Sequence, residues 1–555
     1  MIGRTLKLQL PTLQTNFLRR WSFFSGYLLI FPLLLQFVPV MISGSVTAWL
    51  NWSGALAARI FLAAVFVFCL VKIRSRAAYI FMGLITLATG VVNLLDIYLL
   101  VNFGTVFDYS MWQLVRIAPS HEVSGFFRLF FCRFTTLLIL LVYPLAGVII
   151  FCIKKNRLLY ITIAFSTLLL LFIFNCCGAN FPGAAPDAPG KRLVSFVQQW
   201  QDSGMLRQID ISNKNLQAEN TEKEALYVLV IGESHSRRRS SVYGYMRNTM
   251  PEMKKLFLQQ KIFRFDDAVT PHIMTHLALP QMLTAIPPGN EKPFYEHPNI
   301  LDIFRSSGFK VWYIYNQMPD ESRKLPFLAI ARRADKFISL SNPVKQYDSI
   351  IPDLLQKLIN DPARKKFIII HLLGNHWEYA KTFPAGMKKF KGMPPDANSS
   401  QLKKYDIVND YDNSLLHVDK VLHKLISTVE QTEKNAFLLY LPDHGEALYE
   451  EDDFVGHTDL FPNASTAEIP LLLWISERYA VPGTRESIKR ALKRPFFSAD
   501  LPHLLMELSR IRTSCFIPER SIINPCYKKM PRRVSTRSID YDTMKNKSQV
   551  ISPMQ

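Results

Sequence analysis

Several clusters of carboxylate and imidazole side chains stand in this sequence where chemistry at a metal ion would need them. Glu233 follows the apolar run "YVLVI", and His376 follows "FIIIHLL". Asp443 and His444 follow "FLLYL", and His457 lies in the later segment "EEDDFVGHTD". In open α/β sheets, functional side chains collect just beyond the carboxyl ends of the strands. Because mixed carboxylate and imidazole ligands suit zinc or manganese, these clusters predict a metal site at one sheet edge.

Some of these residues also have ordinary structural interpretations. An adjacent aspartate and histidine at a strand end, such as Asp443 and His444, can pair with each other without a metal. His371 lies inside its apolar run, which is typical of a satisfied histidine in the core. We expect His371 to be buried, and we assign the loop residues His376 and His457 to the site.

The stretch "GESHS" at residues 232–236 raises the alternative of a serine hydrolase. The nucleophile elbow of such enzymes needs G-x-S-x-G, because both glycines relieve crowding in a tight turn. Ser236 occupies the position of the second glycine, so the pattern fails and Glu233 becomes a candidate metal ligand. A metal held by Glu233, Asp443 and His444 keeps a position that a hydroxyl can fill and so become a nucleophile. The residues alone leave four candidate hydroxyls open: Ser234, Thr270, Thr275 and Thr284.

The elements that must position these residues follow from the hydrophobic pattern after about residue 223. Five short apolar runs are typical of buried strands: "YVLVI", "KVWYIY", "FIIIHLL", "FLLYL" and "IPLLLWI". Apolar residues near helical spacing predict a long helix over 402–431. Strands interleaved with helices indicate a mostly parallel sheet covered on both faces. Residues 223–555 are therefore expected to form an α/β catalytic domain.

The N-terminal third is apolar enough to cross a membrane several times. Of the 555 residues, 49% are hydrophobic, and a helical span needs about 20 apolar residues. The segments that reach this length are 22–42, 54–73, 77–101, 134–153 and 158–177. Lys and Arg precede the first span and fill the loops after the second and fourth, which places these loops in the cytoplasm. We therefore expect a five-helix membrane bundle over 1–178, a linker with an interfacial helix over 179–222, and an exported domain.

The formal net charge of +20 fits a protein that works at an anionic lipid surface. Lys and Arg are spread along the chain and no nucleic-acid-binding signature occurs, so we expect no nucleic-acid partner. The arginine run at 237–239 is interpreted as a solvated charge run, with lipid phosphates as the alternative partner. Cys515 and Cys526 permit one disulfide if the domain faces an oxidising compartment.

The motifs around these residues resemble those of the phosphoethanolamine transferases of Gram-negative inner membranes, in the alkaline-phosphatase and sulfatase-like superfamily. The resemblance rests on "VIGESHSRRRSSVYGYMRNTMP", "FRFDDAVTPHIMTHLALPQMLT", "FIIIHLLGNHWEY", "NDYDNSLLHVD" and "PDHGE" followed by "GHTD" and "IPLLLWIS". Together with the five predicted spans, the resemblance covers most of the chain. The branch that the chain resembles most is the one that modifies the lipopolysaccharide core. The resemblance implies a sulfatase-like domain in the periplasm on a multi-pass anchor in the bacterial inner membrane.

The resemblance also implies roles for individual residues. Thr275 matches the nucleophile that takes phosphoethanolamine from phosphatidylethanolamine, before transfer to the core or lipid A of lipopolysaccharide. The implied ligands of the first zinc are Glu233, Thr275, Asp443 and His444. His376 and His457 match positions that contact the transferred phosphate or a second zinc. Glu122, in an aromatic-rich outer loop, matches an acidic residue near the lipid site.

Other functions on the same fold stay open at this point. A phosphoglycerol transferase would share the threonine and the metal, and it would differ in the donor lipid. A non-catalytic membrane protein could keep the fold without the reaction, and it would lack bound zinc. A sulfatase is disfavoured because no C/S-x-P-x-R activation sequence lies near the candidate nucleophiles.

Overall fold

The computed structural model describes residues 216–548 except for the short segments 288, 290–292, 318–325, 341–345, 393–401, 451–453, 460–461, 480–482 and 537. These residues lie within a compact unit that spans Ser203–Gln555. The predicted membrane spans, the predicted interfacial helix and Glu122 lie outside the described residues. Among the helices that are described, none is both long and apolar enough to cross a membrane.

An eight-stranded sheet forms the centre of the domain, in the order β11-β3-β10-β7-β2-β6-β4-β5. Its strands along the chain are β2 (Ala225–Gly232), β3 (Ile262–Val269), β4 (Lys310–Tyr315), β5 (Lys336–Ser339), β6 (Lys365–His371), β7 (Ala436–Pro442), β10 (Glu468–Ile475) and β11 (Phe496–Phe497). Every residue of β2 is buried, with Tyr227 and Leu229 in one core and Val228 and Val230 in the other. This double burial explains the unbroken apolar run, since both faces of the strand must be apolar.

The sheet is mostly parallel, which confirms the prediction from the apolar runs. β7, β2, β6, β4 and β5 are parallel neighbours, and β10 is antiparallel to β3 and β7. All five apolar runs form strands. β3 is absent from the predicted strands because Arg264, Asp266 and Asp267, which are partly exposed, interrupt its apolar pattern.

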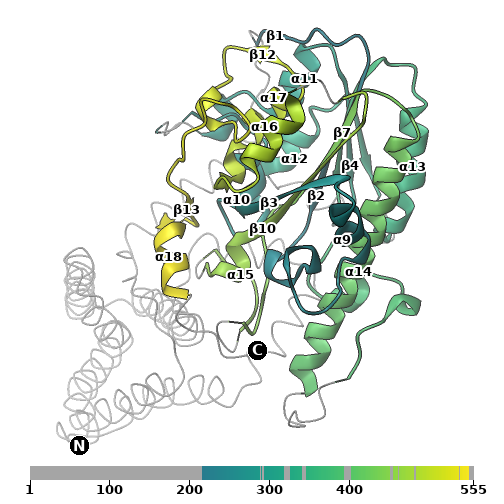
Figure 1. Cartoon of the computed structure of the whole chain (residues 1–555), viewed down its shortest axis with the longest axis vertical. Helices are drawn as coiled ribbons and strands as arrows, with labels where there is room; N and C mark the ends of the chain where they lie inside the picture. Colours follow the sequence, from purple (N-terminus) through teal and green to yellow (C-terminus); the bar gives the residue numbers. More distant parts are fainter. Residues whose placement is uncertain are drawn as a thin grey trace, which may run out of the picture. The chain divides into compact units, whose positions relative to one another are not determined.

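Helices cover both faces of the sheet (Figure 1). On one face lie α9 (Pro251–Leu258), α13 (Ile351–Ile359) and α14 (Leu402–Glu430). On the other face lie α10 (Thr275–Met282), α11 (Ile300–Ser306), α12 (Pro326–Ala331), α16 (Thr484–Ala491) and α17 (Leu501–Leu508). The bounds of α14 confirm the long helix predicted over 402–431.

Short elements complete the domain at its edges. β1 (Ala218–Glu219) pairs with β12 (Arg512–Thr513), so the last residues of the range predicted as linker are joined to the domain. β8 (Ala447–Leu448) pairs with β9 (Val455–Gly456). The remaining elements are α15 (Ala464–Ala467), β13 (Arg533–Val534), β14 (Ile539–Asp540) and α18 (Tyr541–Ser548).

One sequence interpretation outside the site is wrong. The arginines of the 3-10 helix η2 (Arg237–Arg239) do not form a solvated run, because Arg237 and Arg239 are only 12% and 11% exposed. Arg237 pairs with Glu468 at 2.7 Å, and Arg239 pairs with Glu450 at 2.5 Å. The disulfide that the sequence left open is not formed: both cysteines are free, with Cys515 against the core and Cys526 exposed.

Candidate metal centre

Neighbouring strands deliver the polar clusters to one edge of the sheet. The last residue of β2, Gly232, is paired with Pro442 of β7, so Glu233 and Asp443 leave the sheet side by side. The loop after β6 approaches them closely at Gly374, which has a φ of +51°. A Cβ at Gly374 would lie 2.9 Å from the backbone nitrogen of Glu233, so only glycine fits there. The parallel strands thus bring these clusters together as the sequence predicts.

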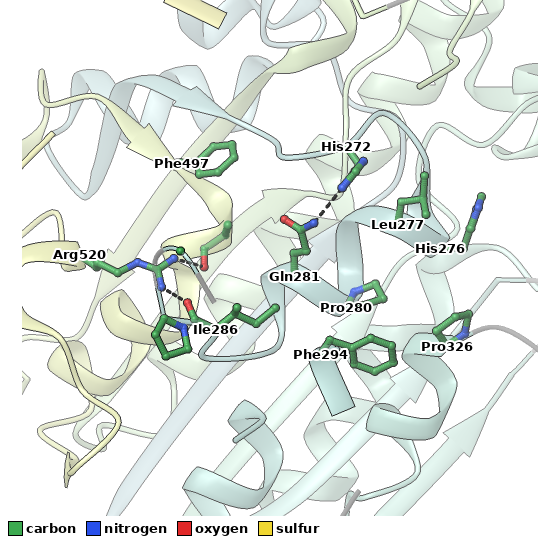
Figure 2. Close-up of a pocket in the computed structure, with 13 residues that line it drawn as sticks. His272, His276, Leu277, Pro280, Gln281, Ile286, Phe294, Pro326, Phe497 and Arg520 are labelled. Atoms are coloured by element: carbon green, nitrogen blue, oxygen red, sulfur yellow. Dashed lines mark hydrogen bonds between the residues drawn. The ribbon is translucent and has the colours of Figure 1, made fainter. Parts of the chain in front are cut away.

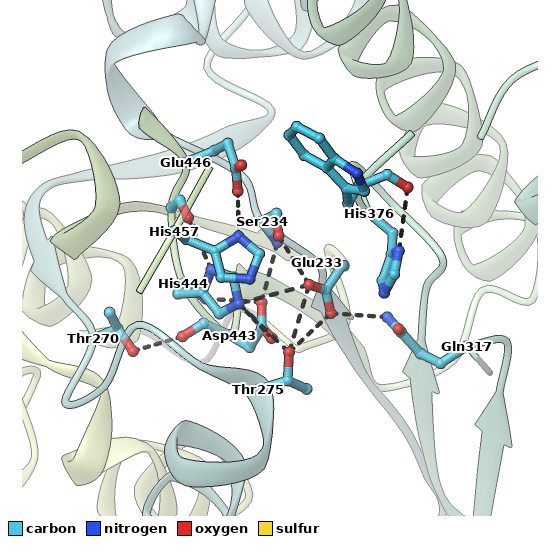
Figure 3. Close-up of polar contacts among 12 residues, drawn as sticks. Glu233, Ser234, Thr270, Thr275, Gln317, His376, Asp443, His444, Glu446 and His457 are labelled. Carbon is cyan, nitrogen blue, oxygen red and sulfur yellow. Dashed lines mark hydrogen bonds and ion pairs between the residues drawn. The ribbon is translucent and has the colours of Figure 1, made fainter. Parts of the chain in front are cut away.

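Glu233, Asp443 and His444 form a compact buried group (Figure 3). Each is at most 2% exposed, and one ligand atom from each lies within 4.8 Å of the others. The Nε2 atom of His444 is 3.6 Å from Oε1 of Glu233 and 3.4 Å from Oδ2 of Asp443. Two carboxylates and one imidazole at these separations have the composition of a zinc ligand set.

The hydrogen bond of His444 to the backbone shows that its unprotonated nitrogen faces the carboxylates. Nδ1 lies 2.8 Å from the carbonyl oxygen of Gly445, so Nδ1 carries the proton and donates it. Nε2 therefore turns a lone pair toward Glu233 and Asp443. Oδ2 of Asp443 is buried and has no hydrogen-bond partner among the described residues. A lone pair and carboxylate oxygens repel one another, and a cation between them would remove this repulsion, so the residues fit a metal ion.

The electrostatics of the group show crowded negative charge that a cation would offset. Burial, together with the charge of Asp443, raises the pKa of Glu233 well above its usual range. Burial also lowers the pKa of His444, which favours the neutral imidazole that binds metals. Two donors orient the carboxylate of Glu233: Nε2 of Gln317 at 3.0 Å and Oγ of Ser234 at 2.9 Å.

Thr275 is the candidate hydroxyl that lies against this group. Its Oγ1 atom is 3.3 Å from Oε2 of Glu233 and 3.4 Å from Nε2 of His444. Thr275 is also the first residue of α10, where unpaired amide groups and the helix dipole favour an anion. The Thr275 hydroxyl therefore lies beside the metal-type ligands and at a helix end that favours a phosphate.

The other three candidate hydroxyls have different surroundings. Thr270 donates to the carbonyl oxygen of Asp443 at 2.5 Å, so it holds the backbone of that strand end. Ser234 has a φ of +52°, and its hydroxyl donates to Glu233. Thr284 lies beyond the C-terminal end of α10, in a bridge with Asn299.

A second group of ligand-type atoms adjoins the first and shares His444. Ligand atoms of His444, Glu446 and His457 lie within 4.8 Å of one another. The ring centres of His444 and His457 are 4.2 Å apart. Glu446 accepts a hydrogen bond from Nδ1 of His457 at 2.7 Å and another from Tyr379 at 2.6 Å. Glu446 thus orients the imidazole of His457 beside the first group.

The remaining histidines predicted from the sequence lie in different settings. His376 lies on the side of the site where Gln317 lies (Figure 3), and its Nδ1 is 3.4 Å from the carbonyl oxygen of Trp377. His371 is fully buried, and its Nδ1 is 3.3 Å from the hydroxyl of Tyr313. Burial lowers the pKa of His371 to about 4. The expected burial in the core is confirmed, but the histidine is not fully satisfied, because its Nε2 has no hydrogen-bond partner among the described residues.

Gln317 and Glu446 contact the site but are absent from the predicted site residues. Gln317 follows β4, and its place just beyond a strand end is the signal that could have found it. Glu446 belongs to "PDHGE", but its contact with His457 depends on the hairpin of β8 and β9, which no local pattern reveals.

Comparisons with known sequences agree with this fold. The Sulfatase family model matches residues 225–511. Phosphoethanolamine transferase EptC of Escherichia coli (strain K12) is 31% identical over 387 residues, which cover 66% of this chain and 66% of that protein. The match thus spans just under two thirds of the length of this relative.

Solved structures are also similar. The C-terminal periplasmic domain of EptC from Escherichia coli, crystallised in complex with Zn, has a TM-score of 0.54 and 30% identity. This similarity covers 59% of the present chain and 96% of that domain. The integral membrane protein lipooligosaccharide phosphoethanolamine transferase A from Neisseria meningitidis has a TM-score of 0.61, over 92% of this chain and 99% of that one. Its identity is 18%, so this second likeness concerns the fold alone.

Proposed function

The chain belongs to the sulfatase family, and we propose that within it the protein is a zinc-dependent phosphoethanolamine transferase. Phosphatidylethanolamine is the proposed donor, and lipopolysaccharide, at its core or its lipid A, is the proposed acceptor. The observation that carries the proposal is the position of the Thr275 hydroxyl beside Glu233 and His444 at the start of α10. The 31% identity to a protein named phosphoethanolamine transferase supports this choice of transferred group.

The residues proposed to hold the zinc are Glu233, Thr275, Asp443 and His444. When bound, zinc would lower the pKa of a hydroxyl and offset charge on the phosphate. The zinc complex of the EptC domain, at 30% identity, supports the choice of this ion over manganese. His376 and His457 are proposed to contact the transferred phosphate or to hold a second ion.

The proposed reaction consists of two displacements at phosphorus. In the first, Oγ1 of Thr275 bonds to the phosphorus while the bond from phosphorus to the diacylglycerol oxygen breaks. The threonine loses its proton to solvent. The diacylglycerol oxygen gains a proton from His376 or His457, and that histidine takes up one from solvent. In the second, an acceptor oxygen bonds to the phosphorus and the bond to Thr275 breaks. An acceptor hydroxyl releases its proton to solvent, and the threonine oxygen takes one up from solvent. The N-terminal amides of α10 favour the negative phosphate oxygens in both steps.

We further propose that residues 1–178 anchor the protein in the bacterial inner membrane by five spans, with the catalytic domain in the periplasm. Both proposed substrates are membrane lipids, so an anchor would hold the site next to them, and Glu122 would lie near the lipid site. The fold likeness to an integral membrane protein extends over 92% of the chain, which supports the anchor. The similarity to a periplasmic domain supports the location.

A transfer assay with defined donor lipids tests this function. Detergent-solubilised protein would be mixed with lipopolysaccharide and with head-group-labelled phosphatidylethanolamine or phosphatidylglycerol. We expect transfer from phosphatidylethanolamine to be at least about tenfold faster, to stop after chelation, and to resume when zinc is restored. A preference for phosphatidylglycerol would instead make the protein a phosphoglycerol transferase. No transfer from either lipid by folded, zinc-loaded protein would contradict an enzymatic function.

A further inference from the structure

A pocket of about 530 Å³ lies beside the helix that carries the candidate nucleophile (Figure 2). Its walls come from α10, from the loop that follows α10, and from the 3-10 helices η10 (Ser498–Asp500) and η11 (Pro518–Arg520). The lining side chains that matter here are His276, Leu277, Gln281, Phe294, Phe497 and Arg520. None of them belongs to the metal centre described above.

The pocket is linked to the reaction centre through α10. Thr275 begins this helix, and the next residues, His276 and Leu277, line the pocket together with Gln281 farther along. A helical turn rises about 5.4 Å, so a ligand in the pocket would lie within about two turns of the nucleophile. An acceptor built of several linked units could therefore place one unit in the pocket and its reactive oxygen at Thr275.

The polar groups of the pocket can bind a ligand that has several hydrogen-bonding atoms. His276 is 8% exposed, and its Nε2 atom has no hydrogen-bond partner among the described residues. Gln281 lies between Arg520 on one side and His276 on the other (Figure 2), and its Nε2 is 2.9 Å from His272. An unpaired buried imidazole nitrogen is costly, and a ligand hydroxyl would remove that cost.

The guanidinium of Arg520 and the imidazole of His272 in the pocket already have carboxylate partners. Arg520 forms a buried ion pair with Asp500, and Nδ1 of His272 lies 3.1 Å from Asp459. A phosphate in this pocket would therefore compete with these carboxylates for the N–H groups that they already bind. An acyl chain would leave the nitrogen of His276 unpaired. With a phosphate and an acyl chain both disfavoured, the ligand that fits the pocket is a neutral one that carries both hydroxyl groups and apolar faces.

We propose that this pocket binds a neutral sugar ring of the glycolipid acceptor. The rings of Phe294 and Phe497 supply apolar surface for the C–H faces of the sugar, while His276 and Gln281 bind its hydroxyl groups. The proposal rests on the proposed transfer to lipopolysaccharide and adds a binding site for its saccharide. The pocket thus selects the acceptor, and the metal centre acts on the donor.

The test separates the two steps of the reaction in the full-length protein. Phe294→Ala removes one apolar face, and Leu277→Trp fills the pocket without removing a hydrogen bond. Phe257→Ala is the matched control, because Phe257 is also partly exposed but lies on α9, on the other face of the sheet. For each variant, the rate of adduct formation from phosphatidylethanolamine is measured first, and lipopolysaccharide is then added to measure the loss of the adduct.

We expect both pocket variants to slow the transfer to lipopolysaccharide by about tenfold or more, while adduct formation stays within about twofold of the unsubstituted protein. Phe257→Ala is expected to leave both rates within about twofold. Transfer rates in the pocket variants equal to that of Phe257→Ala would overturn the proposal. An equal loss in both steps would overturn it as well, since the pocket would then serve the donor or the fold. Absence of any adduct in the unsubstituted protein would instead refute the proposed function on which this site depends.

Discussion

His444 donates from Nδ1 to the carbonyl oxygen of Gly445, which turns the lone pair of Nε2 toward Glu233 and Asp443. The structural alternative left open by the sequence, an Asp443–His444 pair without a metal, would need an N–H group on that side of the ring. The bond to Gly445 places the proton on the other nitrogen. At the scale of single residues, the hydrogen bond to the Gly445 carbonyl thus favours His444 as a metal ligand over an Asp443–His444 pair without a metal.

Removal of either carboxylate should remove both the metal and the reaction. We expect Glu233→Ala and Asp443→Ala to lose tightly bound zinc and to slow transfer by about 100-fold or more, because two negative ligands hold the ion. Zinc content of the purified proteins and the transfer rate are the measurements. Glu219→Ala, at an exposed position on β1, is the matched control. Retained zinc with retained transfer in either variant would show that the site is assigned wrongly.

At the scale of elements, the C-terminal segment holds the loop between β3 and α10. The backbone N–H of Ser535 donates to the carbonyl oxygen of Pro271 at 2.8 Å. Asp459 accepts from the backbone N–H of Thr536 at 2.6 Å and from that of Ile273 at 2.9 Å. This segment lies beyond residues 225–511, which the Sulfatase family model matches. The loop that leads to the candidate nucleophile therefore depends on residues that the family match does not include.

Loosening this segment should slow the first step of the reaction. Arg532 is 2% exposed and pairs with Asp267 at 2.7 Å and with Asp542 at 2.5 Å. We expect Arg532→Ala to destabilise the domain by about 3 kcal/mol, because it leaves Asp267 without its partner. The maximal rate of adduct formation should fall more than the apparent affinity for the donor. Arg512→Ala, an exposed arginine on β12, is the control, and an unchanged rate in folded Arg532→Ala would contradict the positioning role.

Glu468, the first residue of β10, joins three elements and should make stability depend on acid pH. It pairs with Arg237 at 2.7 Å and Arg238 at 3.2 Å and accepts from Tyr541 at 2.7 Å. Burial alone would raise the pKa of Glu468, but the two arginines lower it from an ordinary 4.5 to about 2. Because the folded pKa is the lower one, the stabilisation is complete above the unfolded pKa and is lost as pH falls toward 2.

We expect Glu468→Gln to lower the free energy of unfolding by about 2–3 kcal/mol at pH 7. The variant should also lose less stability than the unsubstituted protein when the pH falls from 4.5 to 2. Thermal unfolding followed by intrinsic fluorescence across this range measures both effects. Stability curves that stay parallel for the two proteins over the acid range would rule out this ion pair as their cause.

Particular elements show what the sequence could predict. β2 and β6 are buried on both faces, so their apolar runs are continuous and were predictable, whereas the charged residues of β3 conceal that strand. The strand-end rule also located Glu233 and Asp443. It could not choose Thr275 over Thr270, because that choice depends on how the loop after β3 folds, and only the family resemblance supplied it. The same limit applies to the arginines of η2, whose partners Glu450 and Glu468 are distant in the chain.

At the scale of the whole molecule, the proposed function joins a membrane anchor to an exported domain. The proposed donor and the proposed acceptor are both lipids, and the loops rich in Lys and Arg should keep the amino terminus in the cytoplasm. Five crossings would then place the metal centre on the periplasmic side. The positive charge of the chain would help to hold the domain near anionic lipid head groups.

Reporter fusions test this topology directly. A phosphatase reporter that is active only in the periplasm should be active when fused after Gln555 or after Ser120. It should be inactive when fused after Arg74 or after Lys155, and a fluorescent reporter that matures only in the cytoplasm should give the reverse pattern. Activity after Arg74 together with inactivity after Gln555 would mean that the orientation is opposite to the one expected.

The measurement that most directly tests the central claim is peptide-level mass spectrometry of the zinc-loaded protein after incubation with phosphatidylethanolamine and no acceptor. We predict a phosphoethanolamine adduct on the peptide that contains Thr275, lost in Thr275→Ala and kept in Thr270→Ala. The reason is that the Thr275 hydroxyl lies against Glu233 and His444, while Thr270 is bonded to the backbone of Asp443. An adduct on another residue, or an adduct that persists in Thr275→Ala, would contradict the account.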